Sequence, residues 1–230
     1  MALRFRPMPG LTSAVLFCLP ILIGLGIWQY HRWQWKTGVL AEIEAAVTAP
    51  PLDGIASLDA LPLEAPVDFR RIRIEGEAVG PAWHVYEPLG SIQWRPFRRV
   101  VADGTEALVG FRTFDDHEKD TVGLPAMTGS RAGYVRRIHP MGGIAEWIGP
   151  DHSPALNRWF AVNPDGAWMA GTDLYVELDP VVTDAAALPV RRPEIANNHV
   201  SYMLTWWSFA IILLVIYAML HHRAGRLSWR

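Results

Sequence analysis

Residues 11–28, near the start of the chain, read LTSAVLFCLPILIGLGIW and contain no charged side chain. A helix rises about 1.5 Å per residue, so this segment nearly crosses a hydrocarbon core about 30 Å thick, and the next two residues can complete it. Pro20 lies mid-span, where membrane helices tolerate proline, so we expect a kink rather than a break. A second uncharged stretch covers residues 200–220. The sequence therefore predicts two transmembrane helices.

The first apolar segment also has features of a secretory signal peptide. Its apolar run is longer than the usual stretch of about 7–15 residues, and no small-x-small cleavage site follows it. Bulky residues stand where cleavage needs small ones, namely Trp28, Gln29, Tyr30 and His31. We therefore expect the segment to remain as a membrane anchor.

Charged residues are strongly segregated along the chain. Residues 1–30 and 200–230 together hold five of the 21 Lys and Arg residues and none of the 23 Asp and Glu residues. The middle therefore carries 16 basic against 23 acidic residues, a net charge of −7. That balance is ordinary for a water-exposed domain and argues against nucleic-acid binding. The only cysteine, Cys18, excludes an intrachain disulfide, a CxxC redox site and a two-thiolate copper site, so we interpret it as a packing residue.

The flanking charges predict the topology. Residues 1–10 and 221–230 form short basic tails that should stay in the cytoplasm, with the spans at 11–30 and 200–220. Long domains translocate with little regard to charge, so we place residues 31–199 outside. Trp28, Trp33 and Trp35 would form an aromatic belt at the outer interface. Because no Arg- and Ser-rich transit sequence precedes the first span, we expect a bacterial cell membrane.

Between the spans, the pattern predicts an antiparallel β-rich α+β domain. The first helix should continue through residues 39–47 and end at Pro50, before a proline-rich linker or surface loop at 48–68. Segments of strand character follow at 70–77, 83–89, 97–102, 107–109, 132–138 and 174–178. Asp103-Gly104 is a strong two-residue hairpin signal. Ser153-Pro154 predicts a short helix through Phe160.

The middle domain offers little catalytic chemistry. It has no GxSxG elbow, no HExxH motif and no phosphate-binding glycine loop. The cluster Asp115-Asp116-His117-Glu118 could bind a divalent cation in a membrane-anchored hydrolase, but it lacks calcium-loop spacing and is more typical of a solvated turn. We therefore expect a protein that is not an enzyme.

The outer ends of the two spans are more informative. The first ends in Gly24-x-Gly26-x-Trp28-Gln29-x-x-Arg32, where the glycines permit close helix packing and Gln29 and Arg32 share one face. The second opens with His199, Tyr202 and Trp206 on one helical stripe.

An imidazole at the membrane edge above aromatic residues could be an axial ligand for haem iron. In that case Arg32, Arg191 and Arg192 could pair with the haem propionates. On spacing alone, a plainer interpretation is favoured, in which Asn197 or Asn198 caps the helix and the aromatic residues belong to the belt. The inner pair His221 and His222 should be still more exposed and is a weaker ligand candidate.

Four pieces of the sequence resemble the surfeit locus protein 1 family, assembly factors for haem–copper cytochrome c oxidase. They are Leu25-Gly26-x-Trp28-Gln29-x-x-Arg32, Phe69-Arg70-Arg71-Ile72-x-Ile74-x-Gly76, Leu108-Val109-x-Phe111 and Asn197-Asn198-His199-x-x-Tyr202-x-x-Thr205-Trp206. The last is the most specific, and the arrangement of two spans around one domain also matches. Where the family has an Arg-Gly-Trp-like turn, this chain has Gly110-Phe111-Arg112-Thr113-Phe114, which puts any role of that turn in doubt.

The resemblance implies a chaperone that binds haem a and aids its insertion into the catalytic subunit of the oxidase. The family's proposed ligand, the histidine that opens the second span, matches His199, and Tyr202, Trp206, Arg32 and Gln29 would complete the haem site. The implied partners are the catalytic subunit, haem a synthase and the lipid bilayer. The alternative is a haem-free membrane scaffold that docks the oxidase subunit or haem synthase.

Overall fold

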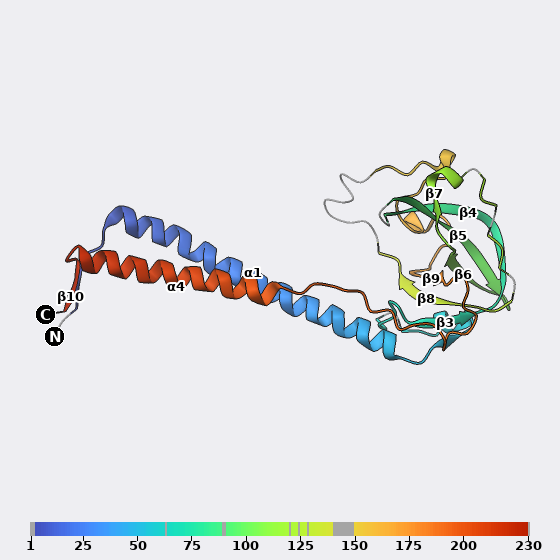
Figure 1. Cartoon of the computed structure of the whole chain (residues 1–230), viewed down its shortest axis with the longest axis horizontal. Helices are drawn as coiled ribbons and strands as arrows, with labels where there is room; N and C mark the ends of the chain where they lie inside the picture. Colours follow the sequence, from blue (N-terminus) through green and yellow to red (C-terminus); the bar gives the residue numbers. More distant parts are fainter. Residues whose placement is uncertain are drawn as a thin grey trace. The chain divides into compact units, whose positions relative to one another are not determined.

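The computed structural model describes residues 3–62, 64–88, 91–119, 121–123, 125–127, 129–139 and 150–229. The chain divides into two compact units (Figure 1). Residues Met1–Ala41 and Glu194–Arg230 form one, here called the helical unit, and Glu42–Pro193 form the other, the sheet unit. The helices are α1 (Pro9–Thr48), α2 (Ala56–Asp59) and α4 (His199–Arg223), with short 3-10 helices at Asp116–Glu118, Pro154–Leu156 and Pro164–Gly166.

Helices α1 and α4 are the two transmembrane spans that the sequence predicts. Helix α1 runs without interruption through Pro20 and stops at Thr48, immediately before the Pro50-Pro51 pair, which confirms its predicted end. Only 11% of the apolar stretch of α1 and 6% of that of α4 is buried, unlike a core helix of a soluble domain. Their apolar surfaces are therefore suited to lipid.

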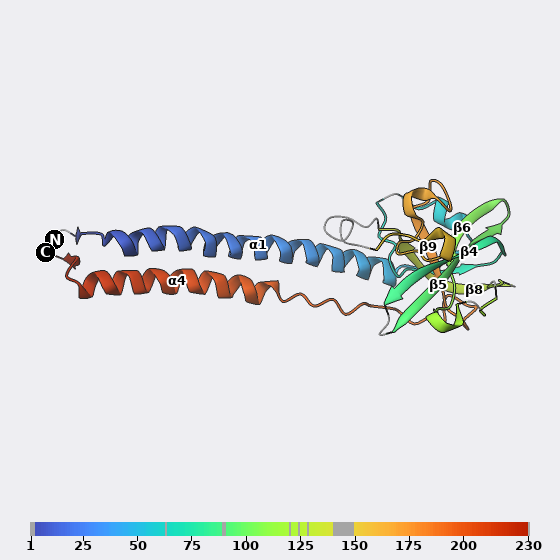
Figure 2. The same ribbon diagram turned by 90° about the horizontal axis from the view of Figure 1, so that it is seen from above.

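The two spans form an antiparallel helical pair, seen side by side in both views (Figures 1 and 2). Apart from Val200, every partly or fully buried residue of α4 recurs at a spacing of three or four: His199, Met203, Trp206, Ala210, Leu213, Tyr217 and His221. On α1, a set of buried or partly buried residues has the same spacing: Val15, Leu19, Leu22, Gly26, Gln29 and Trp33. Such a seven-residue repeat is the pattern of coiled-coil packing, so the spans meet along one continuous seam.

The two tails close the end of the pair near the chain termini, which is called the inner end after the predicted topology. Strand β1 (Leu3–Phe5) pairs antiparallel with β10 (Leu227–Trp229). Beside them the hydroxyl groups of Thr12 and Tyr217 lie 2.8 Å apart. The tails are thus a structured closure of the helical unit.

The sheet unit is built on one sheet with strand order β2-β3-β8-β9-β6-β5-β4, with β7 also paired to β5. The strands are β2 (Leu52–Asp53), β3 (Arg71–Ile74), β4 (Glu77–Pro88), β5 (Ile92–Ala102), β6 (Thr105–Gly110), β7 (Phe114–Asp115), β8 (Arg131–Arg137) and β9 (Leu174–Leu178). Five of its strand pairs are antiparallel, whereas β2–β3 and β6–β9 are parallel. The predicted β-rich α+β class is confirmed, with a mixed sheet.

The predicted hairpin is present between β5 and β6. Asp103 and Gly104 have φ angles of 50° and 78°, so both occupy the left-handed region that a two-residue hairpin turn requires. Ala102 and Thr105 then face each other as the first strand pair. This turn fixes the register between β5 and β6.

Two local predictions are wrong. The helix expected from Ser153 to Phe160 is only the single turn Pro154–Leu156, because the chain then lies along β4, with hydrogen bonds from Trp159 N–H to His84 O and from Tyr86 N–H to Trp159 O. The segment 48–68 is likewise not the irregular linker or surface loop that was predicted. It contains β2 and α2, and it buries Ile55, Leu58 and Val67 in the main core of the sheet unit.

Candidate functional site

At the opposite end of the helical unit, called the outer end after the predicted topology, the two span boundaries are in direct contact. The imidazole Nδ1 of His199, the first residue of α4, lies 2.7 Å from Oε1 of Gln29 on α1. Gln29 is 9% exposed, although it is a polar residue in a membrane-spanning segment. A buried amide in such a place needs a partner, and His199 supplies it.

This hydrogen bond selects the form of the imidazole. The carbonyl oxygen of Gln29 accepts only, so Nδ1 of His199 donates the proton. In the neutral form of the ring, this tautomer leaves the lone pair on Nε2. A histidine fixed through one nitrogen, with the other free to coordinate, is the usual arrangement of a metal-binding imidazole.

The two aromatic residues predicted beside His199 lie differently. Trp206 is partly buried on the seam, and its ring meets Phe209 edge-on with centroids 6.2 Å apart. Tyr202 is 56% exposed and lies at the edge of the seam. Together they form an aromatic strip on the flank of α4, next to the imidazole.

Only one of the two glycines supports close packing. A Cβ atom on Gly26 would lie 2.1 Å from Nε1 of Trp207, so this indole packs directly on the α1 backbone. Nothing lies within 4 Å of the corresponding position on Gly24. The contact between Trp207 and Gly26 was not predicted from the sequence.

The three arginines proposed for propionates have different surroundings. Arg32 is exposed and its guanidinium lies 4.0 Å from the ring centroid of Trp35; within the described part of the chain it has no carboxylate partner. Arg192 instead forms two hydrogen bonds with Glu44 at 2.7 and 2.8 Å, and Arg191 forms one with Glu177 at 2.8 Å. Both of those arginines belong to the sheet unit, so Arg32 is the one of the three that lies in the helical unit.

The segment before α4 is tied to α1 by polar contacts. Lys36 donates a hydrogen bond from its ammonium group to the carbonyl of Ala196, and the amide of Asn197 reaches Thr37 Oγ1 at 3.4 Å. Asn198 occupies the N-cap position without a side-chain cap bond. These contacts, rather than a cap, hold the start of α4 beside α1.

His221 is not an exposed ligand candidate, which corrects the prediction. It is 0% exposed, its Nε2 accepts the backbone N–H of Met8 at 3.1 Å, and its Nδ1 lies 2.8 Å from the carbonyl of Tyr217. Both ring nitrogens are therefore used in closing the inner end. His222 is exposed, as predicted.

The acidic cluster of the sheet unit forms a structured turn. Asp115 and Glu118 bond each other's backbone as a capping box around the 3-10 helix, and Asp116 accepts a hydrogen bond from Trp94 Nε1 at 2.6 Å. Within the ranges described above, no group of three or more His, Cys, Asp or Glu residues could hold a metal ion. The metal-dependent hydrolase hypothesis therefore gains no support.

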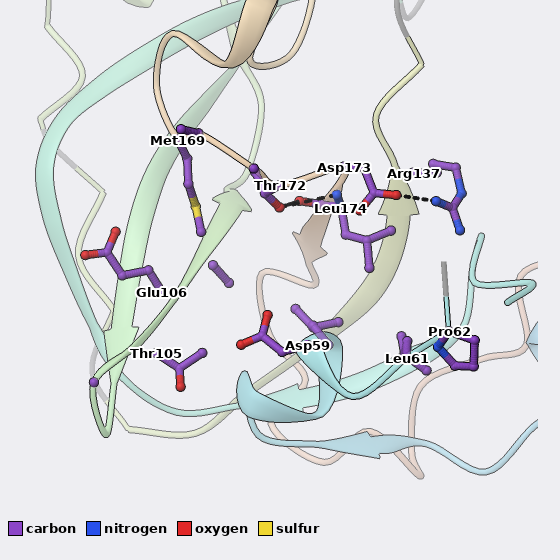
Figure 3. A pocket seen from close by; sticks show the side chains of 15 residues that line it. Asp59, Leu61, Pro62, Thr105, Glu106, Arg137, Met169, Thr172, Asp173 and Leu174 are labelled. Carbon is purple, nitrogen blue, oxygen red and sulfur yellow. Dashed lines mark hydrogen bonds and ion pairs between the residues drawn. The ribbon is translucent and has the colours of Figure 1, made fainter. Parts of the chain in front are cut away.

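A polar pocket of about 460 Å³ lies in the sheet unit between α2, β6 and the segment before β9 (Figure 3). Its acidic groups include Asp173, which pairs with Arg137, and Glu106, whose carboxylate lies 3.3 Å from Arg99. Leu58, Leu61 and Leu174 contribute apolar walls. With two of its carboxylates neutralised, the pocket shows no clear preference for a ligand class.

Comparison with known proteins now places the chain. The family model described as SURF1 family matches residues 16–211, which include both His199 and Gln29. The chain belongs to the SURF1 family. Members of this family are known as cytochrome c oxidase assembly factors.

Similar proteins come from bacteria and from eukaryotes. A SURF1-like protein of Monosiga brevicollis is 28% identical over 95% of this chain and 90% of its own length. A SURF1-like protein of Rickettsia conorii is 25% identical over 91% and 90%. Surfeit locus protein 1 of Mus musculus is 25% identical over 80% of this chain and 67% of its own length. The resemblance seen in the sequence motifs is thus confirmed over nearly the whole chain.

Proposed function

We propose that this SURF1 family member binds haem a at the outer end of the helical unit and aids its insertion into the catalytic subunit of cytochrome c oxidase. The observation that carries the proposal is the 2.7 Å contact between His199 Nδ1 and Gln29 Oε1. In the neutral imidazole, this contact leaves on Nε2 of His199 the lone pair that can coordinate iron at the membrane edge.

The surrounding residues fit a porphyrin. Tyr202 and Trp206 offer aromatic surface against which a macrocycle can lie. Arg32, which lacks a carboxylate partner among the described residues, is available for a propionate. Stacking on Trp35 holds its guanidinium at the interface.

A single histidine ligand suits a carrier. His199 would hold the haem reversibly, because a carrier that binds its cargo too tightly cannot hand it over. No bond of a substrate is broken in this scheme, and the protein acts by binding and orientation. We place it in a bacterial cell membrane with both tails in the cytoplasm, and expect the catalytic subunit and haem a synthase as partners.

The test is to purify the full chain from cells that make haem a and to record its haem content and absorption spectrum. We expect bound haem a in the wild type, loss in His199→Ala and no change in His31→Ala, which removes an exposed imidazole from the same region of α1. An unchanged haem spectrum and stoichiometry in His199→Ala would overturn the ligand assignment. Wild-type protein without haem at any stage, but with stable co-purification of the oxidase subunit or haem synthase, would establish the scaffold alternative.

A further inference from the structure

An apolar groove runs along the pair of spans in the helical unit. It has a volume of about 400 Å³. Its lining comes from both helices and consists of Cys18, Ile21, Leu22, Phe209, Ile212, Leu213 and Ile216. All of these side chains are apolar except for the thiol of Cys18, so the groove suits a hydrocarbon ligand.

The groove continues from the proposed haem site. Tyr202, Phe209 and Ile216 are spaced seven residues apart, so they follow one line along the flank of α4. The contact between Trp206 and Phe209, with ring centroids 6.2 Å apart, joins the aromatic strip to the groove. On α1 the same spacing of seven leads from Arg32 through Leu25 to Cys18. One flank of the pair thus runs from the proposed haem site to the groove.

The other flank of the seam is filled. Trp207 packs against the backbone at Gly26, on the side away from Phe209 by helical periodicity. A ligand seated at His199 that extends toward the middle of the membrane therefore has room along the groove side.

The length of the path restricts the ligand. Phe209 to Ile216 lie ten to seventeen residues after His199, which corresponds to about 15–25 Å along the helix axis at the usual rise. A porphyrin bound at His199 needs a long, flexible apolar substituent to fill that path. Haem a carries such a substituent, its farnesyl chain, and haem b does not.

We propose that this groove holds the farnesyl chain of haem a, so that the helix pair selects haem a over haem b through its tail. The proposal rests on the proposed function. Because lipid is as apolar as the groove, transfer of the tail contributes little, and the preference comes from packing within the groove and from fixing the porphyrin above it.

The test uses the full chain in detergent, titrated with haem a and with haem b. The wild type should bind haem a more tightly. Ile212→Trp should fill the groove and reduce this preference by about tenfold, within the range for overfilled packing. Ile211→Trp is the matched control, since Ile211 and Ile212 are 62% and 51% exposed but only Ile212 lines the groove.

The single thiol gives an independent readout. Cys18 lines the groove and is the only cysteine of the chain. Haem a should slow its labelling by a maleimide, whereas haem b should leave the rate unchanged. Equal affinities for both haems, unchanged in Ile212→Trp, or equal protection of Cys18 by both, would overturn the groove assignment while the haem-carrier function stands. Binding of neither haem would overturn both proposals.

Discussion

Replacing Gln29 by alanine tests how the helix pair prepares His199 for iron. The substitution removes the acceptor 2.7 Å from Nδ1, in a position that is 9% exposed. An unsatisfied donor costs about 1–3 kcal/mol, and the ring loses both its orientation and its preferred tautomer. Groups that orient metal-binding histidines typically contribute about 10- to 100-fold to metal affinity. We expect a loss of that size in haem a affinity for Gln29→Ala.

The assay is an optical titration of purified protein with haem a. Gln29→Glu keeps an acceptor for Nδ1 and should retain most of the affinity, which a purely structural role of the amide would not predict. Gln34→Ala is the control, because Gln34 is exposed and bonds only Tyr30 at 2.9 Å. If Gln29→Ala bound haem a with wild-type affinity and spectrum, the orienting role of this hydrogen bond would be refuted.

Three further predictions concern stability. Gly26→Ala should destabilise the helix pair by about 1–3 kcal/mol in detergent unfolding, because the new methyl group overlaps the indole of Trp207. Gly24→Ala should leave the stability unchanged. Equal effects of the two substitutions would contradict the packing of Trp207 on Gly26. His221→Ala should lower the unfolding temperature and raise hydrogen exchange in both tails, because the backbone N–H of Met8 loses its acceptor and a fully buried ring is removed, while His222→Ala should do neither. Burial, with a contribution from Lys119, lowers the pKa of His84 to about 4. Between about pH 6.5 and about pH 4 the unfolded sheet unit therefore binds more protons than the folded one. The free energy of unfolding should fall as the pH drops through this range. His84→Gln should flatten this part of the stability profile, and an unchanged slope would exclude the group as its source.

The sequence was sufficient for features that depend on local pattern. Uncharged stretches of 18 and 21 residues identified the spans, and Asp103-Gly104 identified the hairpin, since no other turn chemistry competes there. The strand at residues 174–178 was also predicted correctly. Each of these signals lies within a single element or a single turn.

Features that depend on distant partners escaped prediction. The parallel pairing of β6 with β9 joins segments more than sixty residues apart. The Ser153-Pro154 signal was overridden by hydrogen bonds to β4. His221 looked exposed because nothing in a short basic tail indicates that it will pair with the other tail.

The sequence predicted the residues of the candidate site but not the contacts between them. Gln29 and His199 were each named, but their contact depends on the register of two helices whose residues lie 170 positions apart. The three- and four-residue spacing that forms the seam includes Gln29 and His199, and it also includes Gly26, whereas Trp207 lies beside the seam. Arg191 and Arg192 seemed free because their carboxylate partners, Glu177 and Glu44, are remote in the sequence.

The most direct test of the proposed haem site is to identify the nitrogen bound to iron. Protein carrying isotopically labelled histidine, loaded with haem a, can be studied by electron paramagnetic hyperfine spectroscopy. We predict a coupling from one labelled imidazole nitrogen in the wild type and in His31→Ala, and its absence in His199→Ala. A bound haem a whose iron shows no histidine coupling, or shows the same coupling without residue 199, would contradict the role assigned to this side chain.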